Sequence, residues 1–337
     1  MTIRQWGRRI LKYGIGILAL GWILRQVTFE QVVTLLQGIE PEIFLAVIAV
    51  TGFGLAARFY TWHVLCNRFQ RTEFTAAANT DLIVNFVNQL LPSRLSGRAI
   101  APFVVREKSG VTYPGAVAVA GVHTGLYAVL YGAVSVVGFA LVYQQFSPAL
   151  GLVLLLSTAL YVGAGAAVLF AGTRLDTMDA LITRLAAIER VPIVGDRLAT
   201  LIEKLPAFAG ASAESFDELA SDPAIVVRYA AGWAGAMVLA PGLRVWLLLT
   251  AFGVGFEPAA LLPVYLIMAY SVTLLPLTPG GIGVTEATAT AVFVALGVPS
   301  SVIVPVVFLD RFLGVYLPAL VGWYPSLQID FSTLATE

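Results

Sequence analysis

Charged side chains inside apolar segments are the residues of this sequence most suited to chemistry. One is Asp81, and seven others are candidate substrate-binding groups: Arg58, Arg94, Arg98, Arg244, Glu286, Asp310 and Arg311. In a membrane, a charge at such a place is costly and usually marks a substrate or ion pathway. Because guanidinium groups meet phosphate oxygens in a bidentate fork, Arg94 and Arg98 predict a site for a phosphate-bearing group.

The arginines also have structural interpretations, which the sequence leaves open. Arg58 and Arg244 lie near the ends of apolar runs, where a long side chain can reach the interface. Arg94 and Arg98 follow Pro92 and could be anchors on the positively charged side of the membrane. For Arg94 and Arg98, the functional alternative is a clamp on phosphate.

The stretch 271–298 is apolar but broken in its middle. Pro276 and Pro279 each remove a backbone donor. Three glycines, which are also candidate substrate-binding residues, loosen the chain further: Gly280, Gly281 and Gly283. Backbone unwound at membrane depth survives only inside protein or beside a water-filled cavity. The stretch therefore predicts a broken or re-entrant hairpin.

Glu286 follows this break, in the first turn of the next predicted helix. It could simply cap that helix, which is worth about 0.3–1 kcal/mol. That gain is small beside the roughly 2.5–3.5 kcal/mol assigned to a central membrane acid. We therefore expect compensation by Arg98 or Arg311, cavity water, a bound cation or protonation. For Asp310 and Arg311, deep in an apolar run, the structural alternative is an internal ion pair.

Neutral polar side chains accompany the charges on the segment 76–91. Asn85 and Asn88 recur at helical spacing, with Asp81 one turn earlier. A helix face with these three side chains predicts the wall of a wet cavity. Asn85 and Asn88 are therefore candidate substrate-binding residues as well.

Composition decides the class of protein. Of the 337 residues, 58% are hydrophobic and 12% are charged, whereas an average globular chain has about 25% charged residues. This excludes a water-soluble protein. The net charge of zero argues against a nucleic-acid partner. With one cysteine and two histidines, we expect no Cys/His metal site and no cofactor.

A spanning helix needs about 20 apolar residues, and six segments meet this requirement. They are roughly 10–27, 42–65, 113–143, 147–171, 224–252 and 299–323. Two further apolar pieces, 76–91 and 259–276, end in Pro/Gly breaks. The predicted fold is an all-α polytopic membrane protein, a single membrane domain (1–337) with about six spanning helices and two re-entrant broken hairpins.

Lysine and arginine are unevenly distributed between the loops, and this predicts orientation. They gather at the N-terminus, in 66–75 and in the polar segment 172–223. We expect a plasma-membrane protein with both termini cytoplasmic, and with 172–223 as a cytoplasmic amphipathic insertion. This orientation requires the two hairpins to enter the membrane from opposite sides.

A weak internal repeat is consistent with that requirement. At nearly equal offsets, Leu90-Leu91-Pro92 matches Leu274-Leu275-Pro276, Arg58 matches Arg244, and Gly110-Val111 matches Gly297-Val298. The repeats would be 1–143 and 147–323. Many secondary transporters share such an inverted repeat and bind substrate where its halves meet. His123-Thr124 stands where Asp310-Arg311 would be expected, so the charges are not symmetric.

Three motifs in order along the chain carry a family resemblance. They are PGGIGVTEA from Pro279, the polar loop Asn88–Arg98, and the acidic–Arg pair Asp310-Arg311. Together they resemble the flippase-like transmembrane domain of lysylphosphatidylglycerol synthases and of stand-alone proteins. The resemblance implies movement between leaflets of a lipid with a phosphate or aminoacylated head group. We expect a stand-alone member, without an aminoacyl-transferase domain.

The leading functional prediction is thus a lipid translocator that is not an enzyme. Its predicted partners are membrane lipids, and homo-oligomerisation is left open. One alternative is a membrane-embedded transferase acting on a lipid-linked sugar or lipid phosphate. Another is a non-transporting lipid-binding scaffold, with 172–223 as its docking arm.

Overall fold

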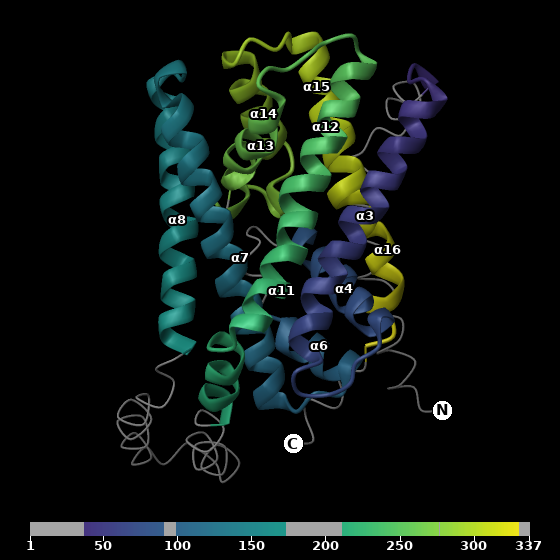
Figure 1. The fold of residues 1–337 in the computed structure, drawn as a ribbon, viewed down its shortest axis with the longest axis vertical. Helices are drawn as coiled ribbons and strands as arrows, with labels where there is room; N and C mark the ends of the chain where they lie inside the picture. Colours follow the sequence, from purple (N-terminus) through teal and green to yellow (C-terminus); the bar gives the residue numbers. More distant parts are fainter. Residues whose placement is uncertain (1–36, 91–98, 173–210, 276, 330–337) are drawn as a thin grey trace, which may run out of the picture.

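The helices are arranged as a bundle in a computed structural model that describes residues 37–90, 99–172, 211–275 and 277–329. Within these ranges every regular element is a helix (Figure 1). In the described part of the chain, five helical stretches are long and apolar enough to cross a membrane. The chain is therefore an all-α, multi-pass membrane protein, as predicted.

These five stretches coincide with five of the predicted spanning segments. They are α3 (Pro41–Cys66), α7 (Tyr113–Val142), α8 (Pro148–Gly172), α11 (Pro223–Ala234) continued by α12 (Ala240–Ala251), and α15 (Ser300–Arg311) continued by α16 (Leu317–Ser326). Several begin with proline in the first turn, where its fixed φ suits the helix and its missing N–H costs no bond. The predicted segment 10–27 lies outside the described residues.

Shorter helices form two broken segments. The first comprises α4 (Phe74–Leu90) and α6 (Ala101–Ser109), and the second comprises α13 (Leu262–Tyr270), the 3-10 turns η6 (Ser271–Leu274) and η7 (Pro279–Gly281), and α14 (Val284–Ala295). Figure 1 shows the first in the lower half of the bundle and the second in the upper half. The predicted break in 271–298 is therefore present. That the segments are re-entrant hairpins of an inverted repeat stays a prediction.

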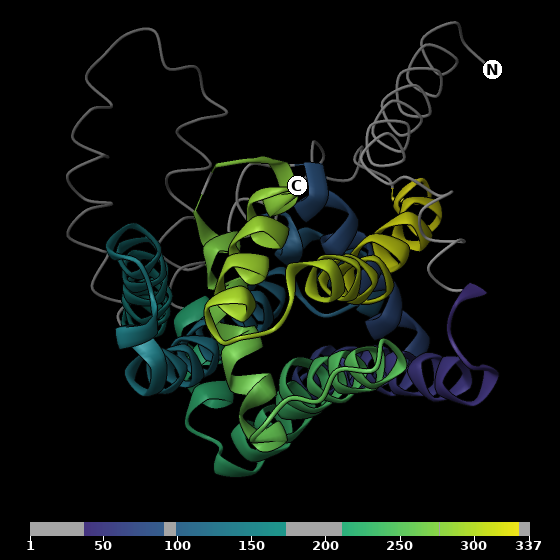
Figure 2. The ribbon, with the colours of Figure 1, turned by 90° about the horizontal axis from the view of Figure 1, so that it is seen from above.

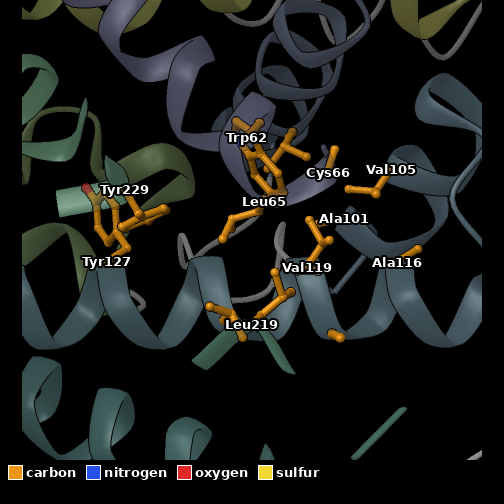
Figure 3. Packing of buried hydrophobic residues seen from close by; sticks show 14 of the residues in the cluster. Trp62, Leu65, Cys66, Ala101, Val105, Ala116, Val119, Tyr127, Leu219 and Tyr229 are labelled. Atoms are coloured by element: carbon orange, nitrogen blue, oxygen red, sulfur yellow. The ribbon is translucent and has the colours of Figure 1, made fainter. Parts of the chain in front are cut away.

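Buried side chains form two clusters. One surrounds Leu65, Val119 and Leu219 and is drawn in Figure 3. The other contains Leu248 and Phe293 with their neighbours on α13 and α15. Together the clusters fix the packing of the broken segments against the long helices.

The outer surface of α8 is also apolar. Leu152, Leu155 and Leu156 are each about half exposed, and Figure 2 shows α8, in teal, at the edge of the bundle. Adjacent exposed leucines are unusual on a soluble monomer but suit contact with lipid tails.

The end of the predicted insertion packs against the bundle. Residues 211–220 are helical, and Phe216 and Leu219 are buried. At the surface, Arg68 pairs with Glu218 at 2.6 Å. Residues 173–210 lie outside the described ranges, and which end of the bundle faces the cytoplasm stays a prediction.

Candidate functional site

A cavity of about 130 Å³ lies where the broken segments meet the long helices. At roughly 10–15 Å³ for each water molecule, it has room for several. Its charged lining residues come from α3, α4, α12 and α15: Arg58, Asp81, Arg244, Asp310 and Arg311. Asn85 and Asn88 of α4 also line it, on the face predicted for them.

Arg58 of α3 is held by groups from two other elements. Its Nε donates to Asp81 Oδ2 at 2.7 Å, and its Nη1 donates to the Gly314 carbonyl at 3.2 Å. Trp62 Nε1 donates to the other oxygen of Asp81 at 3.3 Å. Arg58 therefore points into the bundle, and the interpretation that it reaches the interface is wrong.

Arg244 of α12 is buried more completely. Its Nε and Nη2 lie 2.7 and 2.6 Å from Asp310 Oδ1, and its Nη1 lies 3.5 Å from Thr51 Oγ1. Tyr270 donates its hydroxyl to Asp310 Oδ2 at 2.7 Å. The side chains of this pair are only 5% and 3% exposed, so the interface interpretation is wrong for Arg244 too.

Glu286 is shared between its own helix and α15. Its Oε2 accepts from the Gly283 N–H at 2.7 Å, so it does cap α14. Its Oε1 accepts from Arg311 Nε at 3.1 Å and from the Tyr316 hydroxyl. Capping and charge compensation thus coexist. Arg311 is the compensating partner, and Asp310 pairs elsewhere.

A π-helical turn, Phe312–Tyr316, joins α15 to α16 beside the cavity. Such a wide turn releases carbonyls from the α-helical ladder and is frequent at functional sites. The carbonyl of Gly314 accepts from Arg58, and that of Val315 accepts from Asn85 Nδ2 at 3.0 Å. A Cβ added at Gly314 would lie 2.6 Å from Arg244 Nη2. The turn therefore positions both arginines.

Two of these three arginines have a nitrogen without an acceptor in the described part of the chain. The Nη2 atoms of Arg58 and Arg311 are buried and have no hydrogen-bond partner among the described residues. Buried polar groups are normally paired, so these nitrogens need an explanation. The guanidinium group of Arg311 lies 5.7 and 5.4 Å from the ring centres of Tyr270 and Tyr316, which accounts for part of its environment. A phosphate could accept from such nitrogens.

The glycine motif lies beside the tip of α4 and is not part of the cavity lining. At Gly280, φ is +62°, and an added Cβ would overlap the side chain of Gln89. At Gly281, φ is +72°, and an added Cβ would lie 2.7 Å from Thr285 Oγ1. Gly283 faces open space, but its φ of +82° favours glycine. We interpret these glycines as shaping the loop that presents Glu286 to Arg311.

The structure brings six of the predicted site residues to one cavity: Arg58, Asn85, Asn88, Arg244, Asp310 and Arg311. The three glycines and Glu286 lie behind this lining, and Arg94 and Arg98 fall outside the described residues. Within the described ranges, no three His, Cys, Asp or Glu side chains come together as a metal would require.

Sequence reasoning missed the aromatic partners of the acids. Trp62 lies one turn after Arg58, at a spacing that places two side chains on one helix face, and this signal was available. Tyr316 reaches Glu286 from within the π turn, which no local pattern indicates. Tyr270 reaches Asp310 across the interior, through tertiary packing alone.

The sequence of the chain is similar to those of known membrane proteins. The family described as the lysylphosphatidylglycerol synthase TM region matches residues 9–322. A UPF0104 membrane protein of Pyrococcus horikoshii is 40% identical over 52 residues, which are 15% of this chain and 16% of that relative. No solved structure matches the chain.

Proposed function

The chain belongs to the family of the lysylphosphatidylglycerol synthase transmembrane region, and on this premise we propose that it moves a phosphate-bearing lipid between membrane leaflets. Membership of the family indicates a membrane protein that handles lipid. The translocation step and the phosphate are our proposal beyond that membership.

The arginine-lined cavity is the observation that carries the proposal. Arg58, Arg244 and Arg311 come from three different helices and all line the cavity. Each is paired with one carboxylate, of Asp81, Asp310 or Glu286, but among the described residues the Nη2 atoms of Arg58 and Arg311 have no acceptor. A lipid phosphate offers the acceptors that these two nitrogens lack.

The position of the cavity suits a path for a head group. A polar head group needs a wet, charged route across the bilayer, while its tails can stay in lipid. Residues of both broken segments contribute to the lining, including Asn85 and Asn88 from α4 and Tyr270 from α13. Many secondary transporters bind substrate at such a meeting of discontinuous helices.

A transferase is favoured less by the same contacts. Its general base or metal ligand would come from the acids Asp81, Glu286 and Asp310 or from His123, which lines the cavity. Each of these carboxylates accepts a hydrogen bond from an arginine Nε at 2.7–3.1 Å. These contacts occupy the carboxylate oxygens that a base or a metal ligand would use, and His123 Nδ1 lies 3.2 Å from the Tyr229 hydroxyl, so we propose a role without a chemical step.

The test is Arg58→Lys in sealed proteoliposomes. Lysine keeps the positive charge beside Asp81. It lacks the forked guanidinium group, which can donate to the Gly314 carbonyl and to a phosphate at the same time. We expect the wild type to accelerate the transbilayer movement of fluorescent phosphatidic acid, followed by dithionite quenching. The Arg58→Lys variant should be at least about tenfold slower, which corresponds to about 1.4 kcal/mol in the barrier.

Arg68→Lys is the matched control, because Arg68 makes an exposed ion pair with Glu218 away from the cavity. It should transport at the wild-type rate. If lysine serves as well as arginine at position 58, the phosphate clamp is wrong. If the wild-type protein leaves phosphatidic acid movement at the rate of empty vesicles, the translocator proposal is wrong.

A further inference from the structure

The cavity has an aromatic wall beside its charged groups. This wall consists of Trp62 from α3, His123, Tyr127 and Tyr131 from α7, and Tyr229 and Trp233 from α11. Trp62, Tyr127 and Tyr229, which are labelled in Figure 3, each lie beside the ring of His123. A phosphate alone would use none of these rings, so the wall indicates a further part of the head group.

The rings of the aromatic wall are held in a fixed arrangement. Trp62 stacks on His123, with ring centres 3.8 Å apart, and Tyr127 stacks on Tyr131 at 5.5 Å. Trp233 stands at 83° to both tyrosines, with its centre 6.5 Å from each. Rings locked by one another in this way present rigid flat surfaces at little further loss of entropy.

Unpaired polar atoms at this wall distinguish between chemical classes of ligand. Trp233 Nε1 is buried and has no acceptor among the residues that the structure describes, although a buried indole N–H usually has one. Asn88 Oδ1, on the same cavity, is buried and has no donor within the same ranges. An ammonium group has donors only and cannot accept a hydrogen bond from Trp233 Nε1. A hydroxyl group both donates and accepts, so hydroxyl groups can accept from Trp233 Nε1 and donate to Asn88 Oδ1.

We propose that the phosphate of the substrate carries a ring polyol, a sugar or an inositol, whose apolar ring face lies on the aromatic wall. A hydroxyl of this ring accepts from Trp233 Nε1, and another donates to Asn88 Oδ1. This inference rests on the proposed function, because it takes the arginines to hold the phosphate. It adds the class of the group beyond that phosphate.

The experiment measures lipid binding to the full-length protein in detergent by native mass spectrometry. The probes share dioleoyl chains and differ in head group: phosphatidylinositol, phosphatidylglycerol, phosphatidic acid and phosphatidylcholine. We expect phosphatidylinositol to bind at least about fivefold more tightly than each of the others. Charge alone would favour phosphatidic acid, so this order can come only from the ring.

Trp233→Phe then removes the indole N–H and keeps an aromatic ring. It should abolish the preference for phosphatidylinositol and leave phosphatidic acid binding within twofold. Trp323→Phe is the matched control, because Trp323 Nε1 is also buried without a partner but does not line the cavity. This variant should keep the preference.

Several outcomes would overturn the ring polyol. Phosphatidylcholine binding as tightly as phosphatidylinositol would assign the wall to an ammonium group, and equal binding of phosphatidylglycerol would remove the need for a ring. Equal effects of the two tryptophan variants would make the indole structural. The lipid series on the wild type decides the matter even if Trp233→Phe fails to fold. If the protein transports phosphatidic acid but shows no preference for phosphatidylinositol, this inference is wrong and the proposed function stands.

Discussion

The Arg58–Asp81 and Arg244–Asp310 pairs consist of the same residue types. They differ in how completely the arginine is hydrogen-bonded and buried. In each, an arginine of a spanning helix donates through Nε at 2.7 Å to an aspartate on another helix. In each, an aromatic donor serves the second carboxylate oxygen. The two arginines also match in the predicted repeat.

The difference lies in the remaining nitrogens. All three nitrogens of Arg244 face an oxygen, whereas Arg58 Nη2 faces none in the part of the chain that the structure describes. The side chains of the Arg58 pair are 15% and 8% exposed, against 5% and 3% for the Arg244 pair. The Arg244–Asp310 pair is therefore a structural ion pair, whereas the Arg58–Asp81 pair leaves one N–H donor that a ligand can use. Residue type alone does not distinguish a structural arginine from a binding one.

The largest expected effect comes from removing the acid of the Arg244–Asp310 pair. Asp310→Asn leaves the Arg244 charge buried without a counterion, which should lower the free energy of unfolding by about 3–5 kcal/mol. Asp81→Asn should lower it less, by about 1–3 kcal/mol, because Arg58 is more exposed. Chemical unfolding in detergent micelles measures both. A larger loss for Asp81→Asn would reverse the comparison.

A substitution between the two pairs should have an intermediate effect. In Gly314→Ala, the added Cβ would meet Arg244 Nη2 at 2.6 Å, next to the carbonyl that holds Arg58. We expect a loss of about 1–3 kcal/mol from overpacking, together with slower lipid movement. The control is Gly163→Ala in α8, where nothing lies within 4 Å of the added atom. Thermal unfolding that is the same for both variants would show that Gly314 does not position the arginines.

The smallest expected effect concerns the weakest contact of the Arg244–Asp310 pair. Thr51→Val removes the hydroxyl that lies 3.5 Å from Arg244 Nη1. The loss should be about 0.5–1.5 kcal/mol, the usual net contribution of one hydrogen bond. Lipid movement should stay within twofold of the wild type, because Arg244 stays fixed by Asp310. A tenfold change in the rate would mean that Arg244 also binds substrate.

Much of the fold could be predicted from the sequence, because length and hydropathy act locally. The spanning segments from α3 to α16 follow from runs of about 20 apolar residues. The break after η6 follows from prolines and glycines that no continuous helix tolerates. The face of Asp81, Asn85 and Asn88 follows from helical periodicity.

Part of the candidate site was also fixed by the chain alone. A carboxylate at the start of α14 has to be compensated, whichever helix supplies the charge. The sequence therefore required a partner for Glu286, and it limited the choice to a few groups. It did not choose Arg311, because Arg311 lies on another helix.

Tertiary structure decided the pairing and the boundary of the cavity. Arg58 and Gly314 are 256 positions apart, and Asn85 and Val315 are 230 apart. Sequence periodicity shows which residues share a helix face, but not which helix packs against that face. It therefore could not distinguish an arginine paired inside the bundle from one that reaches the membrane–water interface. Which groups the carbonyls of the π turn meet depends on the packing of this turn against α3 and of α16 against α4. Among the described residues, this packing gives all three nitrogens of Arg244 an acceptor, from Asp310 and Thr51, and leaves Arg58 Nη2 without one.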